Sequence, residues 1–289
     1  MWHLLLNILV TILLLRSDTG AQLSVSGPVL SLNPLATVLN LPADKGAVLS
    51  ATGRDFFYTK NADEPQAIAS ITKLMTALVF IEHNPGWDTT YTITAADQVQ
   101  GGVLNLWPGD EVTIKQLFKT SLIASDNGAT LALVHASGLS EPEFVKKMNE
   151  KALALGLKKT SFVDPVGLGE NNVSTAREVA LLAKAALDVP EISTATETKD
   201  FKFTTVAGRE KLIESTDYLL FDSAENPFII MGGKTGFTDS AGYCFVGRFK
   251  GADGREVISA VLNSSGKNER FRESKDLVNW VFNNYEWRP

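Results

Sequence analysis

The chain has 289 residues, of which 44% are hydrophobic and 21% charged, and its formal net charge is −6. This is the composition of an ordinary globular protein, long enough for one large domain or two small ones. The mild negative charge, without any run of Lys and Arg, argues against nucleic acid as the main partner.

The N-terminal segment differs from the rest of the chain, because residues 4–15 are almost entirely apolar. The segment is short for a membrane span but suits the core of a signal peptide, and small residues at 19–21 allow cleavage before Gln22. We therefore expect export to a periplasmic or other extracytoplasmic compartment, with 1–21 as the signal peptide and 22–40 as a linker. An uncleaved N-terminal anchor is the alternative, and it would be the only membrane contact.

Strand and helix patterns begin after this linker. Two short strands at 47–50 and 55–58 predict a β-hairpin. Residues 68–81 are apolar on nearly every side, which predicts a buried helix. A serine and a lysine are costly to bury without a function, so Ser70 and Lys73 within this helix are candidate functional residues.

The middle of the chain is predicted to be helical and its last third to be mainly strands. The helices are expected at 113–124, from 127 to near 138, at 140–155 and at 175–187, with capping boxes at Thr113-x-x-Gln116 and Thr175-x-x-Glu178. The strands are expected at 201–205, 228–234, 242–250 and 255–263, followed by an amphipathic helix at 268–285.

Strands at both ends bracket this helical middle. The pattern predicts an α/β (α+β) fold for residues 41–289, with an antiparallel sheet flanked by helices and an inserted all-helical lobe. The functional site is expected in the cleft between the two lobes. Cys244, the only cysteine, lies in an apolar run and is expected to be a buried structural thiol.

Three short motifs follow one another along the chain: Ser70-Ile-Thr-Lys73, Ser125-Asp-Asn127 and Lys234-Thr-Gly236. Each arises readily by chance, since Ser-x-x-Lys also occurs at 264–267, so the ordered trio carries the information. A serine near the start of a helix benefits from free N–H groups, and a lysine three residues later lies on the same face. Burial and a second cation, which Lys234 could supply, predict a neutral Lys73 that takes the Ser70 proton as Ser70 attacks a carbonyl.

Longer strings around the motifs narrow the choice of family. They are ASITKLMTA at 69–77, FVDPVGL at 162–168, NVSTAR at 172–177 and GKTGFTDSAG at 233–242. From about residue 40 onward the chain resembles low-molecular-mass penicillin-binding proteins, specifically the D-alanyl-D-alanine carboxypeptidases and endopeptidases of peptidase family S11. The resemblance implies a β-lactamase/transpeptidase-like fold and a serine peptidase that β-lactam antibiotics inhibit. No cofactor is implied, and the absence of a His-Glu-x-x-His motif or Cys cluster predicts no metal.

The resemblance also implies a role for each catalytic residue. Ser70 is expected to be the acyl-ester nucleophile and Lys73 its general base, while Ser125 relays a proton to the leaving amine. The backbone N–H groups of Ser70 and Phe237 are expected to form the oxyanion hole.

Substrate binding is assigned in the same way. Asn127 is expected to bind the peptide carbonyl, and Lys234 and Thr235 the substrate carboxylate. Gly236 allows the substrate backbone to approach the strand edge closely. Ser, Asp and Asn also favour helix N-caps, so capping by Ser125 and Asn127 is the structural alternative, and Asp126 is expected to be structural.

The expected function is a penicillin-sensitive D-Ala-D-Ala carboxypeptidase that acts on peptidoglycan stem peptides through a Ser70 acyl-enzyme. The alternative is a DD-endopeptidase that cuts crosslinks, because the stretch 263–267 lacks the arginine of many family carboxypeptidases, and none follows until Arg270. The stretch 171–177 also looks more like the endopeptidase branch.

Two other functions are less favoured. A class A-like β-lactamase would need a general base for deacylation, which only Glu170 could imitate, and a non-catalytic wall-binding domain would not need Lys73. A Ser-His-Asp triad would require His83 or His135, yet no Gly-x-Ser-x-Gly occurs.

Overall fold

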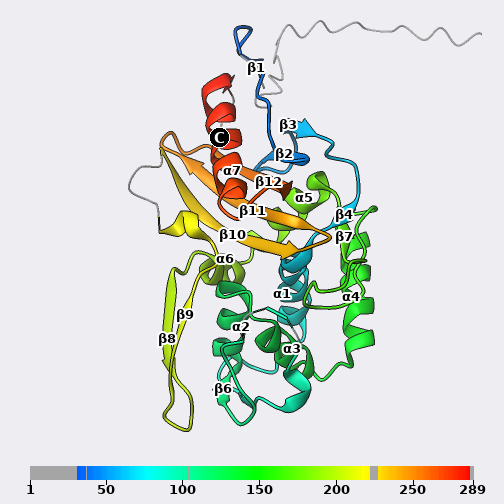
Figure 1. Ribbon diagram of the computed structural model, residues 1–289, viewed down its shortest axis with the longest axis vertical. Helices are drawn as coiled ribbons and strands as arrows, with labels where there is room; N and C mark the ends of the chain where they lie inside the picture. The colour runs from blue at the N-terminus through cyan, green and yellow to red at the C-terminus, as the bar shows by residue number, and fades with distance from the viewer. Residues whose placement is uncertain (1–30, 37, 100, 103, 222–226, 287–289) are drawn as a thin grey trace, which may run out of the picture.

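A five-stranded antiparallel sheet forms one lobe of the molecule, and helices make up most of the other (Figure 1). The computed structural model describes residues 31–36, 38–99, 101–102, 104–221 and 227–286. The expected signal peptide, 1–21, lies outside these residues. No helix in the described part of the chain is long and apolar enough to cross a membrane.

The sheet is built from both ends of the chain. Its strands, in spatial order, are β10 (Phe228–Thr238), β11 (Gly242–Gly251), β12 (Glu256–Ser264), β2 (Lys45–Ser50) and β3 (Phe56–Lys60). The β2–β12 pair joins the two ends, with Ala47 opposite Ala260. The early hairpin and the late strands therefore form a single lobe, as the pattern predicts.

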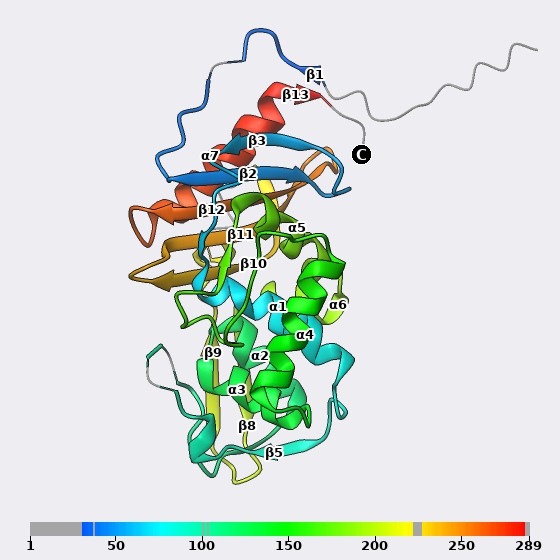
Figure 2. The same ribbon diagram turned by 90° about the vertical axis from the view of Figure 1, so that its right-hand side faces the viewer.

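Helices cover both faces of this sheet (Figure 2). Helix α7 (Glu269–Asn284) packs on one face, and α5 (Ala176–Leu187) packs on the other. Successive side chains of a strand point to opposite faces of the sheet. In β2, Val48 therefore belongs to the hydrophobic cluster under α7, whereas its neighbours Ala47 and Leu49 belong to the cluster under α5.

The second lobe is packed around α1 (Thr72–Glu82), which follows the short 3₁₀ turn η1 (Ala69–Ile71). Its other helices are α2 (Ile114–Ile123), α3 (Asn127–Ala136), α4 (Glu141–Ala154) and α6 (Pro190–Thr196). Helix α2 starts at the expected reciprocal capping box of Thr113 and Gln116. At α5 only half of the expected box forms, because the Glu178 carboxylate accepts the Lys159 N–H instead.

The inserted lobe is not all-helical, which corrects one detail of the prediction. It carries two small antiparallel sheets, β5 (Thr90–Thr92) with β6 (Glu111–Thr113) and β8 (Asp200–Thr204) with β9 (Glu210–Glu214). The remaining short elements are β1 (Ser31–Leu32), β4 (Gln66–Ala67), β7 (Val173–Ser174), β13 (Tyr285–Glu286), η2 (Ala95–Asp97) and η3 (Tyr218–Leu220). Strand β1, in the expected linker, pairs with β13 after the last helix.

Candidate active site

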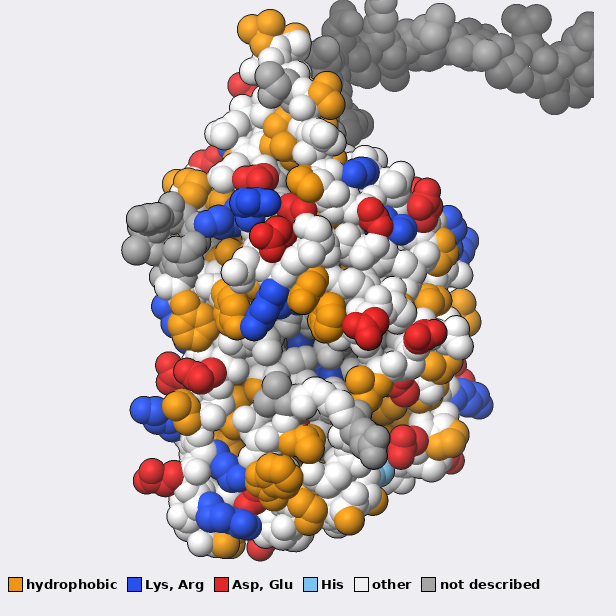
Figure 3. All heavy atoms as spheres, viewed as in Figure 1, with side chains coloured by type: hydrophobic (Ala, Val, Ile, Leu, Met, Phe, Trp, Pro, Cys, Tyr) orange, Lys and Arg blue, Asp and Glu red, His pale blue; other side chains and the backbone are white. Residues whose placement is uncertain are grey.

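A cavity of about 710 Å³ lies between the two lobes and is lined by residues from all three motifs (Figure 3). Its lining residues are Ser70, Gly102, Ala124, Ser125, Asn127, Leu168, Glu214, Ser215, Thr216, Tyr218, Phe221, Thr235, Gly236, Phe237, Lys267 and Arg270. Figure 3 shows the hollow near the middle of this face, with Lys or Arg side-chain atoms visible inside it. Residues of the three motifs thus meet between the two lobes, where the site is expected.

Ser70 and Lys73 meet at the start of α1. Ser70 lies in η1, and the fully buried Lys73 places its Nζ 3.0 Å from Ser70 Oγ. The same Nζ lies 2.6 Å from Asn127 Oδ1 and 2.6 Å from the Val166 carbonyl. A neutral amine has two N–H donors and one lone pair. Because the Asn127 Oδ1 and the Val166 carbonyl oxygen can only accept, they take both donors, and the lone pair remains for the Ser70 hydroxyl proton.

Burial lowers the pKa of Lys73 to about 7, and the nearby carboxylates of Asp126 and Asp164 oppose this effect. The amine can therefore be neutral near neutral pH. We expected Lys234 to contribute to this shift. Instead, repulsion between the two lysines acts on Lys234, whose pKa is lowered well below its usual value by burial first and then by Lys73 and Arg270.

Ser125 lies in the connection between α2 and α3, and Asn127 is the first residue of α3. Ser125 has a φ of 59°, a left-handed conformation that costs a non-glycine residue about 1–3 kcal/mol and is found at functional sites. Its Oγ lies 2.7 Å from Lys234 Nζ. Neither residue caps α3, because Asp126 does so by accepting the Ala129 N–H at 2.8 Å. The structural alternative for Ser125 and Asn127 is therefore wrong.

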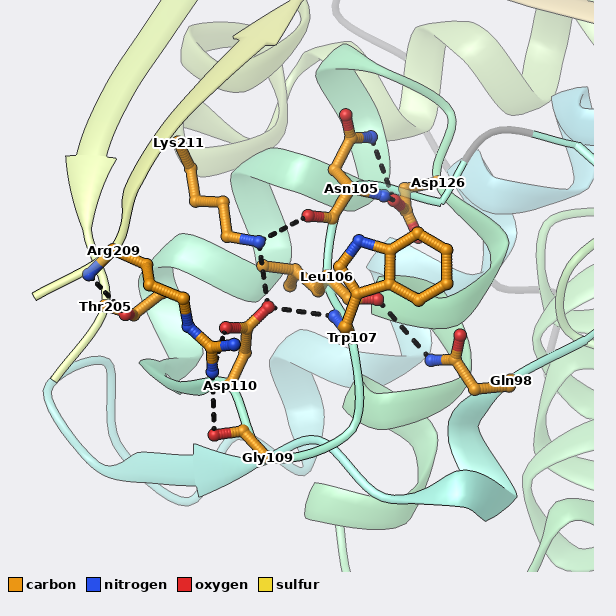
Figure 4. A network of polar contacts seen from close by, with 10 residues as sticks. All are labelled: Gln98, Asn105, Leu106, Trp107, Gly109, Asp110, Asp126, Thr205, Arg209 and Lys211. Carbon is orange, nitrogen blue, oxygen red and sulfur yellow. Dashed lines mark hydrogen bonds and ion pairs between the residues drawn. The ribbon is translucent and has the colours of Figure 1, made fainter. Parts of the chain in front are cut away.

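Asp126 also ties this connection to the preceding loop (Figure 4). Its second oxygen accepts from the backbone N–H of Asn105 at 2.6 Å and from the Asn105 side chain at 2.9 Å. In the same loop the buried Asp110 accepts from Lys211 of β9 at 2.8 Å. Figure 4 shows that these contacts join the loop, the start of α3 and the β8–β9 hairpin.

The third motif lies inside β10 and does not end the strand, which continues to Thr238. Strand β10 is an edge of the five-stranded sheet, so its outer side faces η1 and the cavity. A Cβ on Gly236 would lie 2.7 Å from the Ile68 carbonyl oxygen and 3.3 Å from the Ser70 nitrogen. Only glycine permits this approach. Phe237, the next residue, stacks on Tyr243 at 4.3 Å between ring centroids.

Arg270 lines the cavity too, although we did not assign it a role from the sequence. It follows the start of α7, and its Nη1 donates to the carbonyls of Gly236 at 3.1 Å and Cys244 at 3.3 Å. Its spacing from Ser274 and Leu277 places it on the buried face of that helix. A charged residue in this apolar register was the signal that could have identified it.

The loop before β7 supports Lys73 and does not present an acid to the cavity. Asp164 accepts the N–H groups of Val166 and Gly167 at 2.8 and 2.6 Å, which fixes the Val166 carbonyl against Lys73. Glu170, the residue that could imitate a β-lactamase base, is exposed and does not line the cavity.

The other candidate groups play no part in the cavity. His135 contacts Asp97 at 2.6 Å, outside the cavity. Cys244 is buried as expected, and burial raises the pKa of its thiol to about 11. Within the described ranges no group of His, Cys, Asp and Glu residues could hold a metal ion.

Comparison with known proteins agrees with this geometry. A family model described as D-alanyl-D-alanine carboxypeptidase matches residues 38–266. The chain belongs to this family, peptidase family S11. Among S11 relatives, the D-alanyl-D-alanine carboxypeptidase DacF of Bacillus subtilis is 36% identical over 243 residues, which cover 80% of this chain and 60% of DacF. The chain thus spans less than two thirds of that relative.

Two other similar proteins are matched over a larger share of their own length. The D-alanyl-D-alanine endopeptidase of Haemophilus influenzae is 36% identical over 225 residues, 74% of either chain. Penicillin-binding protein D2 of Listeria monocytogenes, solved with cefotaxime bound, aligns with a TM-score of 0.73 and 32% identity over 85% of this chain and 99% of that one. The family and the β-lactamase/transpeptidase-like fold expected from the motifs are confirmed.

Proposed function

We propose that this chain is a serine-type D-Ala-D-Ala carboxypeptidase that acts on peptidoglycan stem peptides through a Ser70 acyl-enzyme and is inhibited by β-lactams. The contact between Ser70 Oγ and the buried Lys73 Nζ, 3.0 Å long, is the observation that carries this proposal. A serine needs an adjacent base to become a nucleophile, and a lysine with a pKa of about 7 is a suitable one at neutral pH.

In the acylation step, Lys73 takes the Ser70 proton while Oγ attacks the carbonyl carbon of the penultimate D-Ala. The carbonyl oxygen becomes an oxyanion, which the backbone N–H groups of Ser70 and Phe237 stabilise across the narrow gap kept open by Gly236. Ser125 Oγ accepts an N–H of Lys234, so its own proton is free for the leaving amine nitrogen, and the Lys73 ammonium replaces that proton. The C–N bond breaks, D-Ala leaves, and water then hydrolyses the acyl-enzyme by the same route.

Three residues along one side of the cavity position the substrate. The Lys234 ammonium and the Thr235 hydroxyl attract the terminal carboxylate, and Arg270 adds a third cationic or donor group at the same wall. Asn127 holds the peptide carbonyl through its side-chain amide. A site that binds a free terminal carboxylate suits a carboxypeptidase, and Arg270 could take the place of the arginine that is missing from 263–267.

A DD-endopeptidase is the second candidate. The Haemophilus influenzae endopeptidase is as similar to this chain as DacF, with 36% identity in each case. A crosslinked substrate places a longer group beyond the scissile bond, and the cavity of about 710 Å³ leaves room for it. Export by the N-terminal segment, to where such substrates lie, belongs to the same proposal.

The test is intact mass and peptide mapping after brief exposure to benzylpenicillin, with Ser70→Ala as control. A lasting penicilloyl adduct on Ser70 supports the acyl-enzyme. Consumed penicillin without an adduct indicates a β-lactamase, and untouched penicillin indicates a non-catalytic module. Release of D-Ala from a pentapeptide, compared with cleavage of a crosslinked dimer, then separates the two peptidase activities.

A further inference from the structure

Asp217 is a buried carboxylate next to the cavity that the mechanism above does not use. It lies between β9 and η3 and is 2% exposed. Its Oδ1 accepts the Leu219 N–H at 3.0 Å and so caps η3, but Oδ2 has no hydrogen-bond partner among the described residues. A cap uses one oxygen and needs no charge, so capping alone does not explain a carboxylate whose second oxygen is buried and unpaired.

The segment that carries Asp217 is held against the part of β10 that carries Lys234 and Thr235, the wall of the cavity proposed to bind the substrate carboxylate. Thr216, its neighbour, lies with Oγ1 2.6 Å from Thr235 Oγ1 on β10, and Ser215 Oγ accepts the Asp217 N–H at 3.1 Å. Ser215, Thr216 and Tyr218 all line the cavity. Asp217 therefore lies directly behind the wall at which the substrate carboxylate is bound.

Two cations act electrostatically on Asp217, Arg270 on α7 and Lys234 on β10. Both are buried, and Arg270 Nε, like Asp217 Oδ2, has no hydrogen-bond partner in the described chain. Lys73, when protonated, also repels the charge of Lys234. The other groups around Arg270 are Cys244, Tyr218 and Tyr243, which are neutral when protonated.

A cluster of buried cations without an anion would lose its charge. Desolvation and mutual repulsion already lower the pKa of Lys234, and Asp217 is the group that opposes them. A neutral Lys234 could still donate a hydrogen bond, but it would no longer attract a carboxylate by charge.

Resting on the function proposed above, we propose that Asp217 is a positioning residue for substrate capture: its carboxylate is the counter-charge that keeps Lys234 cationic for the terminal carboxylate of the ligand. Asp217 touches no reacting atom. Its effect should therefore appear in binding and not in the acylation step, for which Lys73 supplies the base.

The pH range of the effect follows from the charge of Asp217. Burial raises the pKa of this carboxyl to about 7, with Leu219, Arg270 and Lys234 opposing. Above that pH the anion supports Lys234, and below it Asp217 is protonated and its support is absent. Replacing Asp217 by its neutral isostere should thus change the protein in neutral and alkaline solution and leave it unchanged in acid.

The experiment compares wild-type protein with Asp217→Asn, which keeps the cap acceptor but loses the charge. Stopped-flow acylation by benzylpenicillin and by its methyl ester gives an apparent dissociation constant and a limiting rate constant for each ligand between pH 5 and 9. At pH 8.5 we expect the variant to bind benzylpenicillin about tenfold more weakly, since loss of one neighbouring charge shifts a pKa by about one unit. The limiting rate constant and the affinity for the ester should change by less than about twofold.

Glu273→Gln is the matched control, because it removes another buried carboxylate, on α7, that does not line the cavity. Its affinity should match wild type throughout. An Asp217→Asn profile that coincides with wild type at pH 8.5 overturns the inference, and so does equal weakening for the acid and the ester, which would indicate a structural role. If wild-type protein forms no adduct at all, the proposed function fails first, which separates the two conclusions.

Discussion

The pH dependence of acylation follows from the state of one side chain. With a pKa of about 7, Lys73 is neutral in about half of the molecules at pH 7 and in about one in a hundred at pH 5. A lysine at its usual pKa of about 10.4 would be neutral in fewer than about one in a thousand at pH 7. Only the neutral amine has the lone pair that can accept the Ser70 proton.

We therefore expect the limiting acylation rate to fall about tenfold for each pH unit below 7 and to level off above about pH 8. The measurement is stopped-flow penicilloyl formation at saturating benzylpenicillin, where weaker capture no longer affects the rate. Circular dichroism at each pH excludes unfolding as the cause of the decrease. A rate that stays constant between pH 5 and 8 would refute neutral Lys73 as the base.

Three further results are expected. Lys73→Met should abolish acylation and raise the free energy of unfolding at pH 7 by about 1–4 kcal/mol, measured by urea denaturation. The reason is that the folded state no longer has to bury an amine that is charged when unfolded. This gain should grow as pH falls from 10 to 7, and destabilisation at every pH would contradict the argument. Gly236→Ala should slow acylation at least about tenfold with little change in melting temperature, since its Cβ would lie 2.7 Å from the Ile68 carbonyl and displace η1. A variant that acylates at the wild-type rate would show that the close approach is unimportant. Asp126→Ala should destabilise the protein by about 1–3 kcal/mol, because it removes the α3 cap and both Asn105 contacts. Asn105→Ala keeps the cap and should lower the free energy of unfolding by less. The reverse order would mean that the cap is not the main contribution to stability.

Much of the site could be predicted from the sequence because each motif is local. Lys73 is one helical turn from Ser70, so their contact follows from helix geometry once the helix is recognised. Capping boxes are local in the same way, and the one at Thr113 was predicted correctly. The positions of Ser125 and Lys234 relative to one another could be expected only from the family resemblance, since they are far apart in the chain.

The features that could not be predicted from the sequence depend on contacts between segments that are far apart in the chain. Strand β9 reads Glu-Lys-Leu-Ile-Glu, whose charged ends give a weak strand pattern until β8 is placed beside it. Arg270 reaches the cavity because α7 packs across β11 and β12, from where its side chain contacts the Gly236 and Cys244 carbonyls, and helix periodicity alone does not predict this packing. Glu178 does not complete the expected capping box, because the tertiary fold brings the Lys159 N–H close enough to donate to its carboxylate instead.

The pairing of β2 with β12 has a consequence for the synthesis of this protein. The nucleophile is synthesised early, but the strand that faces it and the helix that carries Arg270 come from the last quarter of the chain. A ribosome-bound chain that stops before β10 has Ser70 and Lys73 but neither the strand proposed to bind the oxyanion nor the residues proposed to bind the carboxylate. Joining residues this far apart is also a slow step in folding, because a long loop must close first. On the proposed function, a nascent polypeptide should remain unlabelled by β-lactams until its C-terminal strands have docked.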